Sequence, residues 1–136
     1  MPTLRLEIVT PEARIYSEDV SSVLVPGSEG ELGVLPEHMP LLTQLAAGEL
    51  RIVKDGQETV LAVGEGFVEI TPTSVSVLTD MAVPESDIDE TAAEAAVKRA
   101  QEALKDDQIS DEDMASAQAV MMKSLAQLKV KRRKKV

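Results

Sequence analysis

The sequence predicts an α+β protein in two parts, a sandwich-like β-domain over residues 1–85 and an antiparallel two-helix hairpin over residues 86–136. In the first part, apolar and polar residues alternate in short runs, and turn residues recur about every ten residues, which is typical of a β-sandwich or barrel. After Pro84 there is no Gly or Pro, and apolar residues recur at helical spacing. Tyr16 and Phe67 are the only aromatic residues, so the core must be aliphatic.

The strands of the first part are short and end at clear turn signals. Leu4, Leu6 and Ile8 alternate with charged residues, which predicts a strand with one buried face. Asp55-Gly56 separates two β-rich runs, and a glycine there tolerates a positive φ, so we expect a tight hairpin. Pro72-Thr73 separates a second pair of runs and predicts another hairpin.

The second part reads as two amphipathic helices. Asp106-Asp107 marks the break between them, and Ser110 with the acidic residues after it is typical of a helix N-terminus. The short connection predicts an antiparallel pair. The predicted apolar stripes comprise Ala92, Ala96, Ala100, Ala103 and Leu104 in the first helix, and Met114, Ala117, Met121, Leu125 and Leu128 in the second.

The alanine-rich stripe suggests that the hairpin is held weakly. A buried methyl group contributes about 0.8 kcal/mol, against roughly 2 kcal/mol for a whole leucine side chain. The hairpin could therefore detach when another surface competes for it. A permanently docked two-helix cap is the alternative that the pattern leaves open.

The net charge of −10 is unevenly distributed along the chain. Residues 1–87 carry four basic and fifteen acidic side chains, whereas residues 88–136 carry ten basic and nine acidic ones. The acidic body argues against nucleic-acid binding, because neutralising phosphates needs a basic surface. The last eight residues form a basic cluster that could approach an acidic partner or serve as a solubilising tail; its members are Lys129, Lys131, Arg132, Arg133, Lys134 and Lys135.

The sequence shows no recognisable catalytic motif, although its single histidine does not by count exclude a Ser-His-Asp triad, and paired acids such as Glu29 and Glu31 are more simply explained as a solvated loop. The chain has no Cys and a single histidine, His38, so a thiol nucleophile or a multi-histidine metal site is excluded. No serine lies in a Gly-x-Ser-x-Gly context, and no phosphate-binding loop with its lysine is present. We expect the isolated chain to catalyse nothing and to need no metal ion or cofactor. No apolar run is long enough to span a membrane, and the N-terminus does not resemble a signal peptide.

The segment from Gly27 to Thr43 concentrates unusual backbone chemistry, with three glycines and two prolines around an apolar run. Such residues fix uncommon backbone angles, so the pattern predicts a shaped loop between strands. A shaped loop on a rigid scaffold is often a contact site. A simple strand crossover at a sandwich corner explains the pattern equally well.

Residues 28–38, followed by Pro40-Leu-Leu-Thr43, closely resemble the signature region of ATP synthase epsilon subunits. Val9-Thr-Pro11, residues 64–69, residues 75–78 and Ile88-Asp89 are similar to other segments of that family, in the same order. The resemblance covers essentially the whole chain. It implies a β-sandwich of about ten strands followed by two antiparallel helices.

The resemblance also implies a function, that of a non-catalytic subunit of the rotating central stalk. The sandwich would bind the gamma subunit and the membrane rotor ring of c subunits, and so couple proton flow to ATP synthesis. The hairpin would inhibit ATP hydrolysis, and its basic end would contact the catalytic alpha and beta subunits. The chain would be peripheral to the cytoplasmic face of the bacterial inner membrane, or to the stromal face of a thylakoid membrane.

Residue roles follow from the same resemblance. Glu31, Leu32, Gly33 and His38 would line the contact with the rotor ring, and residues 129–135 would reach the catalytic head. The regulatory hairpin residues would be Ile88, Asp89, Met121, Leu125 and Leu128.

One position departs from the family's ATP-sensing members. Those members have an arginine where this chain has Ala92, and the second helix offers Lys123 and Gln127 in place of further arginines. Without a guanidinium fork to hold phosphate, we expect ATP binding to be weak or absent. The alternative to the whole reading is a free-standing small-molecule sensor or adaptor with a helical lid, which would not co-purify with a gamma subunit.

Overall fold

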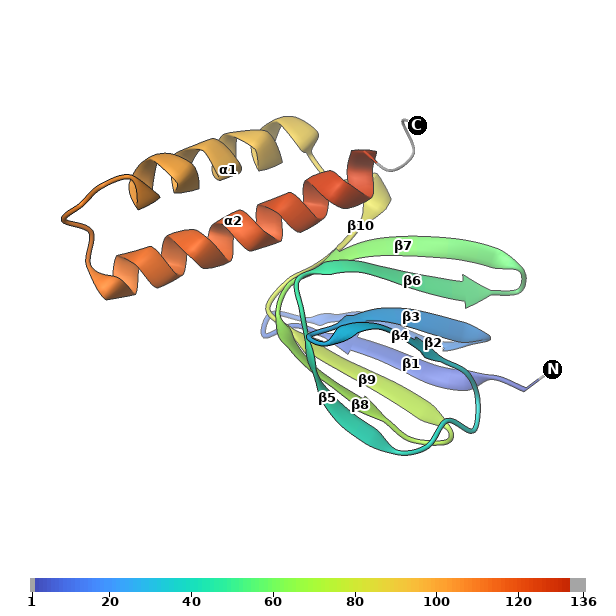
Figure 1. Ribbon diagram of the computed structural model, residues 1–136. Helices are drawn as coiled ribbons and strands as arrows, with labels where there is room; N and C mark the ends of the chain where they lie inside the picture. The colour runs from blue at the N-terminus through green and yellow to red at the C-terminus, as the bar shows by residue number, and fades with distance from the viewer. Residues whose placement is uncertain (1, 133–136) are drawn as a thin grey trace.

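The computed structural model describes residues 2–132, which form ten strands, one short 3-10 turn and two α-helices (Figure 1). The strands are β1 (Leu4–Val9), β2 (Arg14–Val20), β3 (Ser22–Gly27), β4 (Gly30–Val34), β5 (Leu41–Leu45), β6 (Gly48–Lys54), β7 (Gln57–Val63), β8 (Gly66–Ile70), β9 (Ser74–Thr79) and β10 (Ala82–Pro84). The turn η1 (Glu85–Asp87) leads into α1 (Glu90–Leu104) and α2 (Asp111–Arg132). The predicted fold class, a β-sandwich followed by an antiparallel helical hairpin, is confirmed.

The ten strands belong to one strongly curved sheet. Its order is β10-β7-β6-β3-β5-β8-β9-β1-β2, with β4 paired to β3 off this path. The strand pairs are antiparallel except β1 with β9, which run parallel. The curvature brings inner faces together, and every second residue of each strand points inward. The core is aliphatic, as predicted, and its largest fully buried side chains include Leu4, Leu6, Ile8, Leu50, Ile52, Leu61 and Ile70.

Both predicted hairpins are present. Asp55 and Gly56 connect β6 to β7 with φ angles of 51° and 79°. Two consecutive positive φ angles are typical of the type I′ turn, whose twist matches that of the flanking strands. Between β8 and β9, the Thr71 hydroxyl accepts a hydrogen bond from the Ser74 amide at 3.0 Å. The positive φ angles of Asp55 and Gly56 and the hydrogen bond between Thr71 and Ser74 therefore stabilise the two turns locally.

The prediction that residues 27–43 form one long loop is wrong. β4 occupies the middle of this segment and β5 begins inside it. Val34 is fully buried and Leu32 packs against the core, so the period of two is present there but interrupted by glycines. A tight turn joins β3 to β4, because Gly30 has a φ of 127° and a Cβ on Gly27 would lie 2.8 Å from the Gly30 oxygen. The true loop covers residues 35–40.

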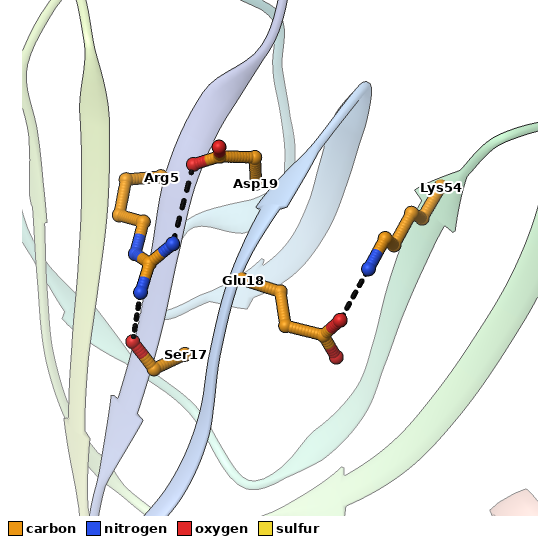
Figure 2. Close-up of polar contacts among 5 residues, drawn as sticks. All are labelled: Arg5, Ser17, Glu18, Asp19 and Lys54. Carbon is orange, nitrogen blue, oxygen red and sulfur yellow. Dashed lines mark hydrogen bonds and ion pairs between the residues drawn. The ribbon is translucent and has the colours of Figure 1, made fainter.

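Polar side chains connect the edge strand β2 to its surroundings (Figure 2). Arg5 on β1 donates a hydrogen bond to the Ser17 hydroxyl at 2.9 Å and lies 3.4 Å from the Asp19 carboxylate. Glu18 on β2 forms an ion pair with Lys54 at the end of β6. The hydrogen bond to Lys54 lowers the pKa of Glu18 below its ordinary value, and the Glu18 carboxylate raises the pKa of Lys54. This pair bridges strands that are far apart in the sheet order.

The lowered pKa of Glu18 predicts a small, pH-dependent contribution to stability. A carboxylate whose pKa is lower in the folded state stabilises the protein above its unfolded pKa, and this stabilisation is lost as pH falls through the folded pKa. We therefore expect Glu18→Gln to unfold at lower urea concentration than the natural chain at pH 7. The difference should shrink below about pH 5. Because both side chains are exposed, the effect is small. Glu12→Gln makes the same charge change in the β1–β2 turn and serves as the control; an identical pH profile for the two variants would contradict the pair's role.

Candidate functional site

Both helices of the hairpin begin at the residues that the sequence indicates. The Asp89 carboxylate accepts a hydrogen bond from the Ala92 amide at 3.0 Å and caps α1. The Ser110 hydroxyl accepts one from the Asp113 amide at 3.1 Å at the start of α2. Such caps satisfy amides that have no partner within the helix. Asp89 is therefore occupied as a structural cap in this arrangement.

The helix α2 lies between α1 and the sandwich (Figure 1). Ala126 and Val130 pack against the sandwich, whereas Ser124 and Leu128 are buried about half a turn away around the helix axis, on the side of α1. Helix α2 therefore buries two opposite stripes. On α1, the fully covered residues are Ala93 and Ala100.

Two details of the predicted stripes are wrong. Leu125 is 47% exposed and Met114 is 37% exposed, although both were placed on the buried face of the second helix. The prediction assumed one buried face, whereas α2 is contacted from two sides. Ala92 is exposed, and the alanine facing α2 is its neighbour Ala93. Leu128 is buried and Met121 partly buried, as predicted.

The hairpin docks on the outer face of β6 and β7 through a small apolar cluster. It comprises Val60, Ala62, Ile88, Ala126 and Val130, with Met81 and Val83 at its edge. Polar contacts flank the cluster: Lys123 lies 3.6 Å from Asp80, and the Lys131 ammonium donates to the Glu85 carbonyl oxygen at 3.4 Å. Beneath the helix, the buried Glu49 accepts a hydrogen bond from Arg51 at 2.9 Å. This interface is far smaller than the sandwich core.

The basic end of α2 is engaged in the docked hairpin. Arg132 donates to the Glu90 carboxylate at 2.8 Å and also pairs with Glu94. The hydrogen bond to Glu90 raises the pKa of Arg132 above its ordinary value. Lys129 in the same turn is exposed. Arg133, Lys134 and Lys135, which were also predicted to contact a catalytic head, lie outside the described residues.

The four residues predicted to contact a rotor ring are spread along β4 and the loop after it. Glu31 and Gly33 are exposed, and Leu32 is partly buried. Glu31 lies near the β3–β4 turn, at the end of the sandwich beside the hairpin. His38 lies at the opposite end, where the neighbouring Glu37 amide donates to the Pro72 carbonyl oxygen at 2.8 Å. The structure therefore arranges these residues in a line and does not gather them into one cluster.

The sequence analysis missed an exposed apolar face on the sandwich. Leu42 on β5, Phe67 on β8 and Leu78 on β9 are 69%, 52% and 53% exposed, and Phe67 lies directly opposite Leu78 in the register. A groove of about 490 Å³ separates Phe67 from Met122 of α2, which is also exposed. A signal was present in the sequence, because Phe67 alternates in phase with Glu69 and out of phase with the buried Val68 and Ile70.

Within residues 2–132, no group of three or more His, Asp or Glu side chains is placed to hold a metal ion. No helix in the described part of the chain is long and apolar enough to cross a membrane.

Comparisons with known proteins agree with these observations. The family described as "ATP synthase, Delta/Epsilon chain, beta-sandwich domain" matches residues 3–85, and "ATP synthase, Delta/Epsilon chain, long alpha-helix domain" matches residues 86–132. The ATP synthase epsilon chain of Laribacter hongkongensis is 43% identical over 131 residues, covering 95% of this chain and 93% of that protein. The ATP synthase epsilon chain 2 of Ralstonia nicotianae is 44% identical over 129 residues, covering 94% and 92%.

A solved structure shares the fold. A chain of the Euglena gracilis mitochondrial ATP synthase, in a structure containing OSCP, F1 and the c-ring, superposes with a TM-score of 0.75 at 22% identity, covering 90% of this chain and 77% of that one. Identity and coverage against the bacterial relatives settle the family. The chain therefore belongs to the ATP synthase delta/epsilon family, among the epsilon chains of the central stalk, which are not themselves catalytic.

Proposed function

We propose that this chain couples rotation of the membrane rotor ring to ATP synthesis and that its hairpin inhibits ATP hydrolysis by the catalytic head. The observation that carries the proposal is the exposed apolar face of Leu42, Phe67 and Leu78, which continues across a groove to Met122 on the hairpin. Apolar side chains gathered on one face mark a protein–protein contact. A stalk partner such as the gamma subunit would cover this face and contact both parts of the chain at once.

The apolar face can be tested by co-purification with the gamma subunit. We expect Phe67→Asp and Leu42→Asp each to weaken the complex at least about thirtyfold, as for central interface residues. Both side chains are exposed, so the sandwich should remain folded. Leu35→Asp is the matched control, since Leu35 is 63% exposed but lies beside a different groove. Undiminished binding of Phe67→Asp would exclude this face as the contact with the gamma subunit.

The contact with the rotor ring is proposed along β4. Among the described strands, β4 pairs only with β3, so its other edge is open from Glu31 towards the loop that holds His38. An open strand edge offers backbone and short polar groups to a partner. A rigid edge of this kind would transmit torque with little deformation. The surface of the ring would then lie along the length of β4.

Single cysteines can test the ring contact, because the chain has no cysteine of its own. We expect Glu31→Cys and His38→Cys each to form a disulfide with a cysteine on the polar loops of the ring, in membranes that retain coupling. Gln101→Cys, on the exposed side of α1, should not cross-link. Failure at Glu31, or equal yields at Glu31 and Gln101, would remove β4 from the contact.

The inhibitory role is proposed from the small docking cluster. A hairpin held by a few alanine and valine side chains can be displaced by a competing surface, because the two states differ by only a few kcal/mol. Released from the sandwich, the helices would extend towards the catalytic alpha and beta subunits. We also propose that the protein is peripheral to the membrane, at the cytoplasmic face in a bacterium.

A further inference from the structure

Two acidic residues of α1 hold the end of α2. Glu90 and Glu94 are four residues apart, so they lie on the same face of α1. Both carboxylates contact the guanidinium of Arg132, Glu90 through Nε at 2.8 Å and Glu94 through a terminal nitrogen. A planar guanidinium that bonds two carboxylates is held in position more firmly than one in a single surface pair. We refer to Glu90 and Glu94 as the acidic pair.

The acidic pair lies at the open end of the hairpin. There the start of α1 meets the end of α2, while residues 105–110 connect the other ends. Between these points α1 buries Ala93 and Ala100, and partly buries Ala96, Val97, Ala103 and Leu104. The contact is built mostly from alanine side chains on α1, so the polar contact at the open end adds to it and fixes the start of α1 against the end of α2.

We propose that the acidic pair is an internal competitor for the basic end of α2, holding Arg132 while the hairpin is closed and yielding it to a carboxylate-rich surface of a partner protein. This inference rests on the proposed function and names how its regulatory element is held. Lys131 is tied to the Glu85 carbonyl oxygen in the same closed state, whereas Lys129 is exposed. Lys129 would make the first contact with the partner. Arg132 would follow once its ion pairs with Glu90 and Glu94 break.

The proposed exchange replaces one set of carboxylates at Arg132 with another. A partner carboxylate replaces the Glu90 and Glu94 carboxylates at the same guanidinium, so the number of charge-assisted hydrogen bonds is conserved. Salt weakens both arrangements, because the side chains are exposed. The balance is therefore set by how many carboxylates each surface presents.

The test measures opening of the hairpin in the full-length chain. Spin labels on cysteines introduced at the exposed Gln101 and Gln118 report the distance between α1 and α2. We expect Glu90→Gln with Glu94→Gln to raise the fraction of long distances about two- to fivefold, the range of a surface ion-pair network. The control, Glu102→Gln with Asp107→Asn, removes the same charge from the last turn of α1 and the connection after it, and should leave the distribution unchanged. Equal distributions for all three chains would overturn the proposal.

Exchanging the charges of Arg132 and Glu94 tests whether the ion pair itself, and not a change in helix propensity, keeps the hairpin closed. Arg132→Glu should open the hairpin, and adding Glu94→Arg should close it again. No rescue by the exchange would overturn the role of the pair.

The regulatory consequence is measured separately in the reassembled ATP synthase, where the double glutamine variant should inhibit hydrolysis more strongly than the natural chain. If the hairpin opens in the free chain but hydrolysis does not change, the acidic pair stands and the proposed inhibitory function fails.

Discussion

Replacing Gly66 with alanine is expected to abolish stable folding of the sandwich. A Cβ at this position would lie 1.8 Å from the carbonyl oxygen of Leu78 and 2.9 Å from the Cα of Thr79. These are backbone atoms of the paired strand β9, so no side-chain rotation can relieve the overlap. The strands would have to separate at the point where β8 begins. We expect a loss of more than about 4 kcal/mol, measured as the urea midpoint or as failure to recover folded protein.

Two other glycines provide graded controls. Gly33→Ala should change stability by less than about 0.5 kcal/mol, because the nearest atom to its new Cβ is the Leu24 Cδ1 at 4.0 Å. Gly64→Ala should fall between the two. Its Cβ would lie 1.9 Å from the Asp80 carboxylate, a side chain that can move but would then leave Lys123. A Gly66→Ala chain as stable as Gly33→Ala would show that the β8–β9 approach is looser than described.

Removing the hairpin after Pro84 is expected to have the largest effect on function. If the hairpin inhibits hydrolysis and its docked and extended states are similarly populated, truncation should raise ATP hydrolysis by the assembled enzyme at least about twofold. Synthesis should remain coupled, since the exposed apolar face and β4 lie in the sandwich. The measurements are ATP hydrolysis and ATP synthesis by membranes carrying the truncated chain, with gamma binding as the check that the sandwich is intact.

A full-length variant should change hydrolysis in the opposite direction. Val130 is fully buried against β7, so Val130→Asp would place a charge in the docking cluster and favour the undocked hairpin. Hydrolysis should then fall below that of the natural chain. Lys98→Asp, on the exposed side of α1, introduces the same carboxylate without touching the cluster. Unchanged hydrolysis in both the truncated and the Val130→Asp enzymes would exclude the inhibitory role.

The sequence predicted the features that depend on neighbours in the chain. Alternation at Leu4, Leu6 and Ile8, the Asp55-Gly56 turn and the cap at Ser110 each follow from a few adjacent residues, and each is present. Strand β4 was missed because Gly30 and Gly33 interrupt an alternation that only Leu32 and Val34 carry. Local patterns predict local structure well when the residues that form them are contiguous.

Features that depend on distant contacts could not be predicted. Leu125 is exposed because α2 is buried from two sides, and nothing in the helix itself shows where the second surface lies. Glu31 is separated from His38 because the extended strand β4, which the sequence analysis did not predict, runs between them. The apolar face needs three strands to bring Leu42, Phe67 and Leu78 together, although the phase of Phe67 was a usable signal.

The parallel pairing of β1 with β9 has a consequence for biosynthesis. The first strand has no completed sheet to join until residue 79 has left the ribosome, because its neighbour on one side is the ninth strand. Long-range pairings of this kind slow folding to milliseconds or longer. The nascent chain must therefore keep Leu4, Leu6 and Ile8 from aggregating in the meantime. Once β9 emerges the barrel-like body can close, before the helical segment has emerged from the ribosome.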